Sequence, residues 1–308
     1  MKKIFIDGSA GTTGLRIYER IGARADLEMI VLPEALRKDP NARKEAINSA
    51  DVAFLCLPDD AARESVSFVE NPSVTVIDTS TAHRTLPDWA YGFPELSKKH
   101  EEKILSSKRI AVPGCHASGF IALVYPLIEA GVLDKDELLS CHSLTGYSGG
   151  GKKMIAQYEA ENRSPLLSAP RHYALAQQHK HLKEMQAITG IANAPAFCPI
   201  VGDFYSGMLV SVPLFSNQIK ATADEIKEIY ANKYNGAIVQ YKESIDEEGF
   251  ISALTLSGKD GMSVTVTGNA DRMVLMAAYD NLGKGASGAA VECMNLALGE
   301  EKTKGLIL

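Results

Sequence analysis

Short apolar runs alternate with helix-like stretches over the first 115 residues, and this alternation constrains the fold more than any other feature. The apolar runs are residues 2–7, 27–32, 51–58, 74–80 and 108–115, and the helix-like stretches include residues 14–24, 43–50 and 60–70. Strands that are apolar almost throughout belong to a sheet covered on both faces, which implies parallel strands with right-handed helical crossovers. We therefore predict an α/β fold with a doubly wound parallel sheet.

The pattern changes after about residue 135. Residues 198–215 and 262–280 contain longer strands in which apolar and polar residues alternate, as in an antiparallel or mixed sheet. These strands predict a second domain. The last segment, residues 281–299, combines small residues with apolar residues at helical spacing, so we expect a closely packed helix that returns to the first domain.

A glycine-rich loop follows the first predicted strand and opens the first predicted helix. Gly8, Gly11 and Gly14 are spaced GxxGxxG, and glycines there let a dinucleotide pyrophosphate approach the backbone N–H groups at a helix N-terminus. The same spacing also occurs in tight strand-to-helix turns that bind nothing. Its position after strand one favours a Rossmann-type cofactor site. The residues expected to bind the cofactor are Gly8, Ser9, Ala10, Gly11, Thr12, Thr13 and Gly14.

The segment after the second predicted strand decides which nicotinamide cofactor is expected. Glu34 would hold the ribose hydroxyls of NAD, whereas Arg37 and Lys38 would neutralise the 2'-phosphate of NADP. We favour NADP. The alternative is that all three are solvated loop charges.

The chain has five scattered cysteines and no CxxC pair, so neither a zinc knuckle nor a disulfide framework is expected. Cys115 alone lies between a predicted strand and the N-terminus of a long apolar helix, residues 116–131. A helix N-terminus stabilises a thiolate, and a glycine on either side leaves room for a carbonyl. Cys115 is therefore the candidate nucleophile.

Thiol chemistry also needs an acid or base within hydrogen-bonding reach. His179 and His181 lie two residues apart, followed by Glu184. His116 adjoins the cysteine, but adjacent side chains generally point apart. The further histidines that could contact a ligand are His83, His142 and His172.

Composition excludes several classes of function. The formal net charge is -6 with no dense Lys and Arg cluster, so nucleic acid is not an expected partner. Asp7 and Gly8 interrupt the first apolar run too early for a signal peptide, and residues 119–133 are too short to span a bilayer. We expect a cytoplasmic protein with reduced thiols.

Seven motifs in order resemble the shorter form of the N-acetyl-gamma-glutamyl-phosphate reductases, within the wider semialdehyde dehydrogenase family. The resemblance spans essentially the whole chain. The motifs are GSAGTTG at 8–14, DTSTAHR at 78–84, YGFPEL at 91–96, PGCHASG at 113–119, GYSGGGK at 146–152, HKHLKEM at 179–185 and DNLGKGASGAA at 280–290. Two positions depart from the commoner pattern: Val112 replaces an asparagine, and Lys183 replaces a proline.

The resemblance implies an NADP-binding domain of residues 1–114 plus 281–308, with a catalytic and dimerisation α+β domain of residues 115–280 inserted. It implies that Cys115 is the nucleophile and His179 the acid/base. The residues it places near the nicotinamide are Ser148, Gly149 and Asn281.

The expected activity is NADPH-dependent reduction of N-acetyl-gamma-glutamyl phosphate, in arginine biosynthesis, through a thioester on the cysteine. The chain is expected to form a homo-oligomer, either a dimer or a tetramer. We also expect the active site in a cleft between the domains, at the carboxyl ends of the parallel strands. The residues expected to bind the anionic substrate are Arg84, Lys152, Arg171, His181 and Glu184. No metal is expected.

Three rival functions remain open on the sequence. Aspartate-semialdehyde dehydrogenase shares the expected fold, cysteine and cofactor, although the His-x-His segment and YGFPEL favour the glutamyl reductase. An NADP-binding protein without catalysis would keep the loop but no thiolate. A cysteine hydrolase would use cysteine and histidine without the loop.

Overall fold

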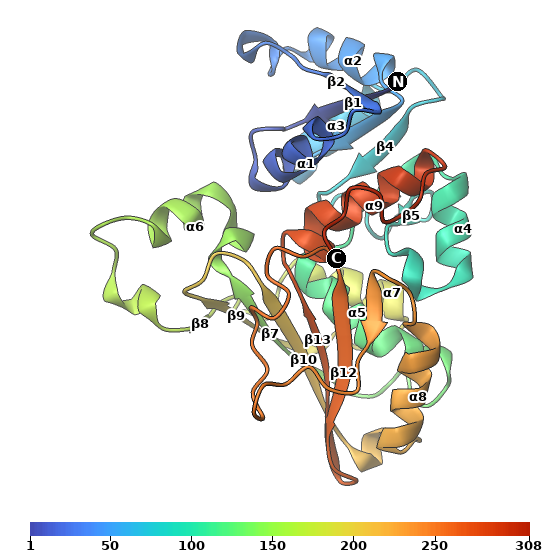
Figure 1. The fold of residues 1–308 in the computed structure, drawn as a ribbon, viewed down its shortest axis with the longest axis vertical. Helices are drawn as coiled ribbons and strands as arrows, with labels where there is room; N and C mark the ends of the chain where they lie inside the picture. Colours follow the sequence, from blue (N-terminus) through green and yellow to red (C-terminus); the bar gives the residue numbers. More distant parts are fainter. The chain divides into compact units, whose positions relative to one another are not determined.

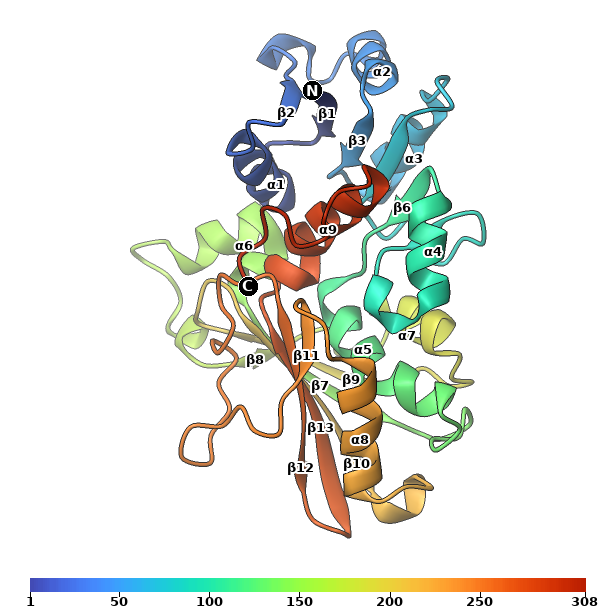
Figure 2. The same ribbon diagram turned by 45° about the vertical axis from the view of Figure 1, so that its right-hand side comes forward.

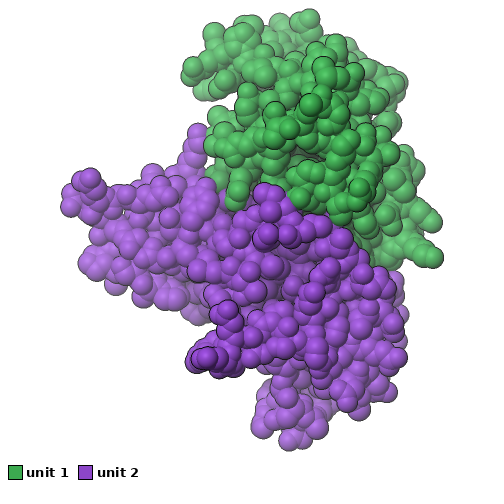
Figure 3. Space-filling model, in the orientation of Figure 1, with its two compact units in different colours: residues 1–114, 286–306 green, residues 115–285, 307–308 purple.

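The computed structural model describes residues 1–308, which divide into two compact units. Unit 1 comprises Met1–Gly114 and Ala286–Leu306, and unit 2 comprises Cys115–Gly285 and Ile307–Leu308. Figure 3 colours unit 1 green and unit 2 purple. The chain passes from the first unit to the second at the peptide bond before Cys115.

Unit 1 contains a six-stranded sheet in which every pair of neighbours is parallel, in the order β2-β1-β3-β4-β6-β5. Its strands are β1 (Lys2–Asp7), β2 (Leu27–Ile30), β3 (Val52–Leu55), β4 (Thr75–Asp78), β5 (Ala90–Tyr91) and β6 (Arg109–Ala111). The strand order reverses between β1 and β3. In open parallel sheets, ligands bind at such a reversal, outside the carboxyl ends of the strands. The predicted fold class is confirmed.

Helices cover both faces of this sheet, which is why its strands are apolar almost throughout. The helices of unit 1 are α1 (Thr12–Gly22), α2 (Pro40–Ser49), α3 (Asp59–Ser67), α4 (Lys98–Ser106) and α9 (Gly288–Ala297). Successive strand residues alternate between two cores: Ile4 and Ile6 pack with α1, α4 and α9, whereas Phe5 packs with α2 and α3. Figure 1 shows α9 beside α4 although they lie far apart in the sequence.

Unit 2 contains a seven-stranded mixed sheet in the order β11-β12-β13-β10-β7-β9-β8. The strands are β7 (Ser140–Gly146), β8 (Arg171–His172), β9 (Ala196–Gly202), β10 (Met208–Phe215), β11 (Val239–Tyr241), β12 (Met262–Gly268) and β13 (Arg272–Tyr279). The central strands β12, β13, β10 and β7 are antiparallel, and Figure 2 shows β12, β13 and β10 side by side. In β10 and the first part of β13, buried residues alternate with half-buried ones, as the sequence predicts, whereas the first five residues of β12 are all buried.

The long helix α5 (Cys115–Glu129) packs on β10 and β13 and contacts α7 (His181–Thr189) and α8 (Ala223–Lys233). It is buried almost throughout yet contains Pro126, which lacks the N–H that would bind the carbonyl of Ala122. The hydroxyl of Tyr234 donates to that carbonyl at 2.7 Å and satisfies it. The helix therefore continues through the proline with its main chain hydrogen-bonded.

Shorter helical segments complete the fold. They are α6 (Gly151–Tyr158), the 3-10 turns Glu34–Leu36, Pro94–Leu96, Tyr147–Gly150, Pro165–Ser168 and Ser216–Gln218, and the π-helical turn Gly283–Ser287. None of the helices combines the length and apolar character that crossing a bilayer requires.

Candidate active site

The loop after β1 has a backbone that only glycine suits. Gly8 has φ +87°, and a Cβ atom there would lie 2.3 Å from the carbonyl oxygen of Cys56. Gly11 provides no side-chain cap for α1, and the buried Oγ1 of Thr12 makes no hydrogen bond in the chain. An uncapped helix N-terminus with an unsatisfied hydroxyl fits an anionic group such as a pyrophosphate.

A pocket of about 670 Å³ opens beside the glycine loop, entirely within unit 1. Its size is that of a small-molecule site. The polar and glycine-loop residues that line it are Asp7, Gly8, Ser9, Ala10, Glu34, Arg37, Lys38 and Arg43. The structure therefore brings the predicted loop together with the three predicted charges after β2.

A buried ion pair fixes the end of β1 against this pocket. Nη2 of Arg43 lies 3.1 Å from Oδ2 of Asp7, and the hydroxyl of Ser65 donates to the same oxygen at 2.8 Å. Both charged residues are below 10% exposure. Because removing one partner would leave a buried charge, the pair holds the strand end in one position. No local pattern in the sequence marks Arg43 or Ser65 as partners of Asp7.

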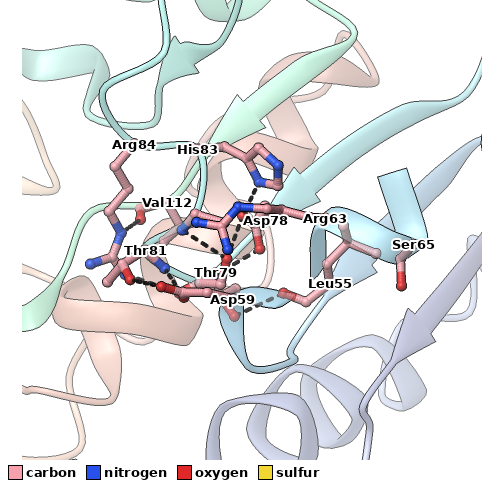
Figure 4. Close-up of polar contacts among 12 residues, drawn as sticks. Leu55, Asp59, Arg63, Ser65, Asp78, Thr79, Thr81, His83, Arg84 and Val112 are labelled. Atoms are coloured by element: carbon pink, nitrogen blue, oxygen red, sulfur yellow. Dashed lines mark hydrogen bonds and ion pairs between the residues drawn. The ribbon is translucent and has the colours of Figure 1, made fainter. Parts of the chain in front are cut away.

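Arg84, expected to bind the acyl phosphate, lies buried after β4 (Figure 4). Its Nε donates to the carbonyl of Val112 at 2.8 Å, and its Nη2 donates to the carbonyl of Thr79 at 2.9 Å. The N–H of Val112 also donates to the carbonyl of Asp78. These contacts anchor the main chain just before Cys115.

Within the DTSTAHR motif, Asp78 binds both His83 and Ser80. Nδ1 of His83 lies 2.6 Å from Oδ2 of Asp78, and the hydroxyl of Ser80 donates to that oxygen at 2.7 Å. The His83 ring stacks on Trp89, with ring centroids 4.1 Å apart. His83, a possible ligand contact on the sequence, is therefore built into the packing of unit 1.

Cys115 is the first residue of α5, where the free N–H groups and the dipole of the helix favour a thiolate. It is half-buried. The hydroxyl of Tyr279 donates to the Cys115 carbonyl at 2.5 Å and accepts from the N–H of Gly119 at 3.0 Å. A Cβ atom on Gly285 would lie 3.0 Å from the Cys115 Cβ, so the missing side chain leaves the cysteine room.

Other thiols lie where burial keeps them protonated. Burial raises the pKa of the Cys56 thiol to about 12, and it also raises the pKa of Cys141. Cys293 is fully buried. The five cysteines form no disulfide. Cys115 is therefore the best-placed cysteine for nucleophilic chemistry.

Three histidines and a tyrosine gather around the start of α5 in unit 2. Nδ1 of His116 lies 2.6 Å from the Ser143 hydroxyl, and its Nε2 lies 2.5 Å from the Tyr173 hydroxyl. The centroid of the His179 ring lies 5.7 Å from that of His116, and the centroid of His181 lies 5.6 Å from it. The predicted His-x-His pair thus packs against the residue that follows the cysteine.

The pKa shifts of this cluster favour neutral imidazoles. Burial, and then the charge of His179, lower the pKa of His116 to about 3, and burial lowers the pKa of His179 to about 4. Burial raises the pKa of Tyr173, and the charge of a Cys115 thiolate raises it further. The Tyr173 hydroxyl, which contacts Nε2 of His116, therefore keeps its proton.

Two models of known protein families match the chain, one in each unit. The family models that match are "Semialdehyde dehydrogenase, NAD binding domain" over residues 13–104 and "Semialdehyde dehydrogenase, dimerisation domain" over residues 115–281. The chain belongs to the semialdehyde dehydrogenase family. The family resemblance inferred from the seven motifs is confirmed.

Within the family, the chain is 46% identical to the N-acetyl-gamma-glutamyl-phosphate reductases of Brucella ovis and Brucella canis. Each alignment covers 97% of this chain and 99% of the relative. Solved aspartate semialdehyde dehydrogenases share the fold at lower identity. That of Vibrio cholerae gives a TM-score of 0.72 at 15% identity over 97% of this chain and 98% of the other. That of Francisella tularensis gives 0.71 at 13% over 96% and 99%.

The residues that the family resemblance assigns to the nicotinamide lie together in unit 2. Nδ2 of Asn281 donates to the Ser148 hydroxyl at 3.0 Å, and its Oδ1 accepts from the N–H of Gly207. A Cβ atom on Gly149 would lie 3.6 Å from that Nδ2. Asn281 thus fixes the turn that carries the other two residues.

The remaining expected substrate residues occupy different settings. Nη2 of Arg171 donates to the hydroxyl of Tyr158 at 2.9 Å, while its buried Nε has no partner in the chain. Lys152 is exposed in the first turn of α6. Glu184 and His181 are buried on α7. Arg171 therefore keeps one buried N–H donor without a partner in the chain.

The sequence gives no indication of Tyr173, and it gives His116 only a minor place among the candidate histidines. His116 was expected to point away from the cysteine and its chemistry, but its ring joins the cluster of His179 and His181. Only the pairing of β8 with β9 brings Tyr173 to that place, because its N–H donates to the Pro199 carbonyl. No local pattern could have indicated this contact.

Proposed function

We propose that the chain reduces N-acetyl-gamma-glutamyl phosphate to N-acetylglutamate semialdehyde, with NADPH as reductant and phosphate as the second product. The observation that carries this proposal is 46% identity over 97% of the chain with reductases of that name. The half-buried thiol at the start of α5, beside a histidine cluster, supports the chemistry. The glycine loop and its pocket support the cofactor.

In the first stage the Cys115 thiolate attacks the carbonyl carbon of the acyl phosphate. A C–S bond forms, the C–O bond to phosphate breaks, and the leaving phosphate takes a proton from solvent. The N-terminus of α5 stabilises the thiolate. His179 packs against His116, the residue after the cysteine. It is the residue proposed to exchange a proton with the oxygen of the reacting group.

In the second stage the thioester is reduced. NADPH, when bound, supplies the hydride. The C–S bond then breaks, which releases the aldehyde and restores the Cys115 thiolate. The residues proposed to orient the nicotinamide are Asn281, Ser148 and Gly149. Arg171, whose Nε has no partner in the chain, is proposed to bind the anionic substrate. The other residues proposed to bind it are Arg84, Lys152, His181 and Glu184.

The proposal for NADP rather than NAD rests on charge. Arg37 and Lys38 line the pocket beside the glycine loop, where a 2'-phosphate would meet these two cations and the carboxylate of Glu34. The other two charged residues of the pocket, Asp7 and Arg43, form an ion pair with each other. We also propose a cytoplasmic location, because a thiolate nucleophile and NADPH both require a reducing compartment.

We propose that the chain forms a homo-oligomer through the seven-stranded sheet. One family model is named for dimerisation. Helix α5 packs on one face of the sheet, and the residues that alternate with the buried ones include six apolar side chains that are only half-buried. These are Leu144, Ile200, Leu209, Pro213, Val274 and Met276. Sedimentation equilibrium of the purified chain tests this: a mass of 33.2 kDa would contradict it.

The direct test of the activity compares two aldehydes in the reverse direction, with phosphate present. With NADP as oxidant, we expect kcat/KM for N-acetylglutamate semialdehyde to exceed that for aspartate semialdehyde by at least ~100-fold. A site built for the longer, acylated substrate leaves some of its polar groups unpaired when the shorter aldehyde binds. Initial rates with NADP and with NAD, measured in parallel, check substrate and cofactor together.

Preference for aspartate semialdehyde would overturn the proposal in favour of the rival within the family. The structural matches to aspartate semialdehyde dehydrogenases, at 13–16% identity, support a common fold and not that substrate.

A further inference from the structure

We propose that Tyr279 is a positioning residue of the reaction: its hydroxyl holds the first turn of α5, and with it the sulfur of Cys115, to the end of β13. This inference rests on the proposed function, in which Cys115 is the nucleophile. The phenol acts through the main chain of the cysteine and takes no proton during the reaction.

The Tyr279 hydroxyl bridges the two ends of the first turn of α5. It donates to the carbonyl of Cys115 at 2.5 Å and accepts from the N–H of Gly119 at 3.0 Å. These are a carbonyl and an N–H four residues apart, which face each other along an α-helix. Helix ends fray. A buried hydroxyl bound to both groups therefore fixes the turn that carries the sulfur.

The packing of α5 on the sheet admits this hydroxyl because residue 119 is a glycine. Tyr279 is fully buried, and α5 packs on its strand and on β10. A Cβ atom on Gly119 would lie 2.7 Å from the Tyr279 hydroxyl and 2.6 Å from Cγ2 of Val210. A glycine inside a helix is destabilising, so its presence here is explained by the close approach of the strands.

The two residues that follow Tyr279 hold other parts of the site. The carbonyl of Asp280 accepts from the N–H of Gly285, and a Cβ atom on that glycine would lie 3.0 Å from the Cys115 Cβ. Nδ2 of Asn281 donates to the Ser148 hydroxyl. One strand end therefore fixes the cysteine, the turn packed against it and the turn proposed for the nicotinamide. A displacement of about 1 Å in such a frame can cost ~100-fold in rate.

The phenol keeps its proton while the cysteine is a thiolate. Burial, and then the charge of a Cys115 thiolate, raise the pKa of Tyr279 well above its usual value. The N–H of Gly119 lowers this pKa, while Cys141 on β7 and Glu184 on α7 raise it further. The hydroxyl therefore remains a donor to the Cys115 carbonyl, and its proton offsets part of the negative charge of that oxygen near the sulfur.

The first test compares two buried tyrosines that bind the same helix. Tyr279→Phe removes the hydroxyl and keeps the ring. Tyr230→Phe is the matched control, because the Tyr230 hydroxyl donates to the Leu123 carbonyl at 2.5 Å, about two turns beyond the cysteine. Tyr279→Phe should raise the pH midpoint for alkylation of Cys115 by iodoacetamide by ~0.5 or more, and Tyr230→Phe should leave it within ~0.2. Mass spectrometry of the peptide that contains Cys115 measures the alkylation.

The second test is the effect on turnover. Tyr279→Phe should lower kcat by ~10-fold or more, while KM for the acyl phosphate and Kd for NADPH stay within ~twofold. Tyr230→Phe should keep kcat within ~twofold. Urea unfolding of both variants shows how much stability each loses, so a general loss of stability is distinguished from displacement of the sulfur. Either an unchanged midpoint or an unchanged kcat in Tyr279→Phe would overturn the proposal.

Hydrogen exchange tests the contact in the resting protein. In the unchanged chain the Gly119 N–H should exchange with deuterium as slowly as the Leu123 N–H inside the helix, and at least ~10-fold faster in Tyr279→Phe. Fast exchange of Gly119 in the unchanged chain would contradict the contact. If the unchanged chain does not turn over N-acetyl-gamma-glutamyl phosphate, the proposed function fails, whereas the alkylation midpoint and the exchange rate still decide whether Tyr279 positions the cysteine.

Discussion

Replacing Cys115 with alanine is expected to lower kcat for reduction of the acyl phosphate by ~10⁴-fold or more, because no thioester can form without the sulfur. NADPH binding should stay within about twofold, since the pocket beside the glycine loop is lined by unit 1 residues only. Steady-state rates of NADPH oxidation and a fluorescence titration of NADPH measure the two quantities on the same preparation.

Cys198→Ala is the control for this variant. Cys198 is also a half-buried thiol of unit 2, but it lies within β9 and not at a helix N-terminus. We expect it to keep nearly full activity. Substantial turnover by the Cys115 variant would show that the acyl group does not pass through this sulfur.

Lowering the pH from about 7 to about 4 should reduce the free energy of unfolding by about 3 kcal/mol through His116 alone. Burial, and then the charge of His179, lower the pKa of His116 to about 3, whereas the unfolded chain has the ordinary value of 6.5. Between these values the unfolded state binds a proton that the folded state does not. The stabilisation is therefore complete above pH 6.5 and is lost as the pH falls toward 3. Urea unfolding at a series of pH values measures it.

The dependence of stability on pH, not stability at one pH, isolates this effect. His116→Gln should make the free energy of unfolding markedly less dependent on pH between 4 and 7, whatever the variant loses at neutral pH through its contacts with Ser143 and Tyr173. His142→Gln, at an exposed position on β7, should keep the full dependence. Equal pH dependence in all three proteins would mean that His116 is charged when folded.

The parallel sheet could be predicted because both of its faces are buried. Residues Val52–Leu55 are all buried, yet they alternate between two cores, so the strand is apolar throughout and cannot belong to a half-exposed sheet. The glycine loop was equally predictable. Gly8 adopts a positive φ, a local requirement that selects glycine, whereas its close approach to the carbonyl of Cys56 after β3 depends on the fold.

The polar contacts of the site could not be predicted, because they join residues far apart in the sequence. His116 meets Ser143 and Tyr173, which lie 27 and 57 residues away. Arg84 could be recognised as a candidate cation, but its contacts with the carbonyls of Val112 and Thr79 depend on how β4 and β6 pair. Spacing identifies residue types, whereas the sheet decides which groups they meet.

Mass spectrometry of the protein mixed with N-acetyl-gamma-glutamyl phosphate, without NADPH, tests the covalent role of Cys115 most directly. The account predicts an added N-acetylglutamyl group on the peptide that contains Cys115, absent from the Cys115→Ala protein and removed when NADPH is supplied. The protein could instead turn over rapidly with NADPH and yet show no adduct on that peptide in rapidly quenched samples taken without NADPH. That result would contradict the covalent role of Cys115.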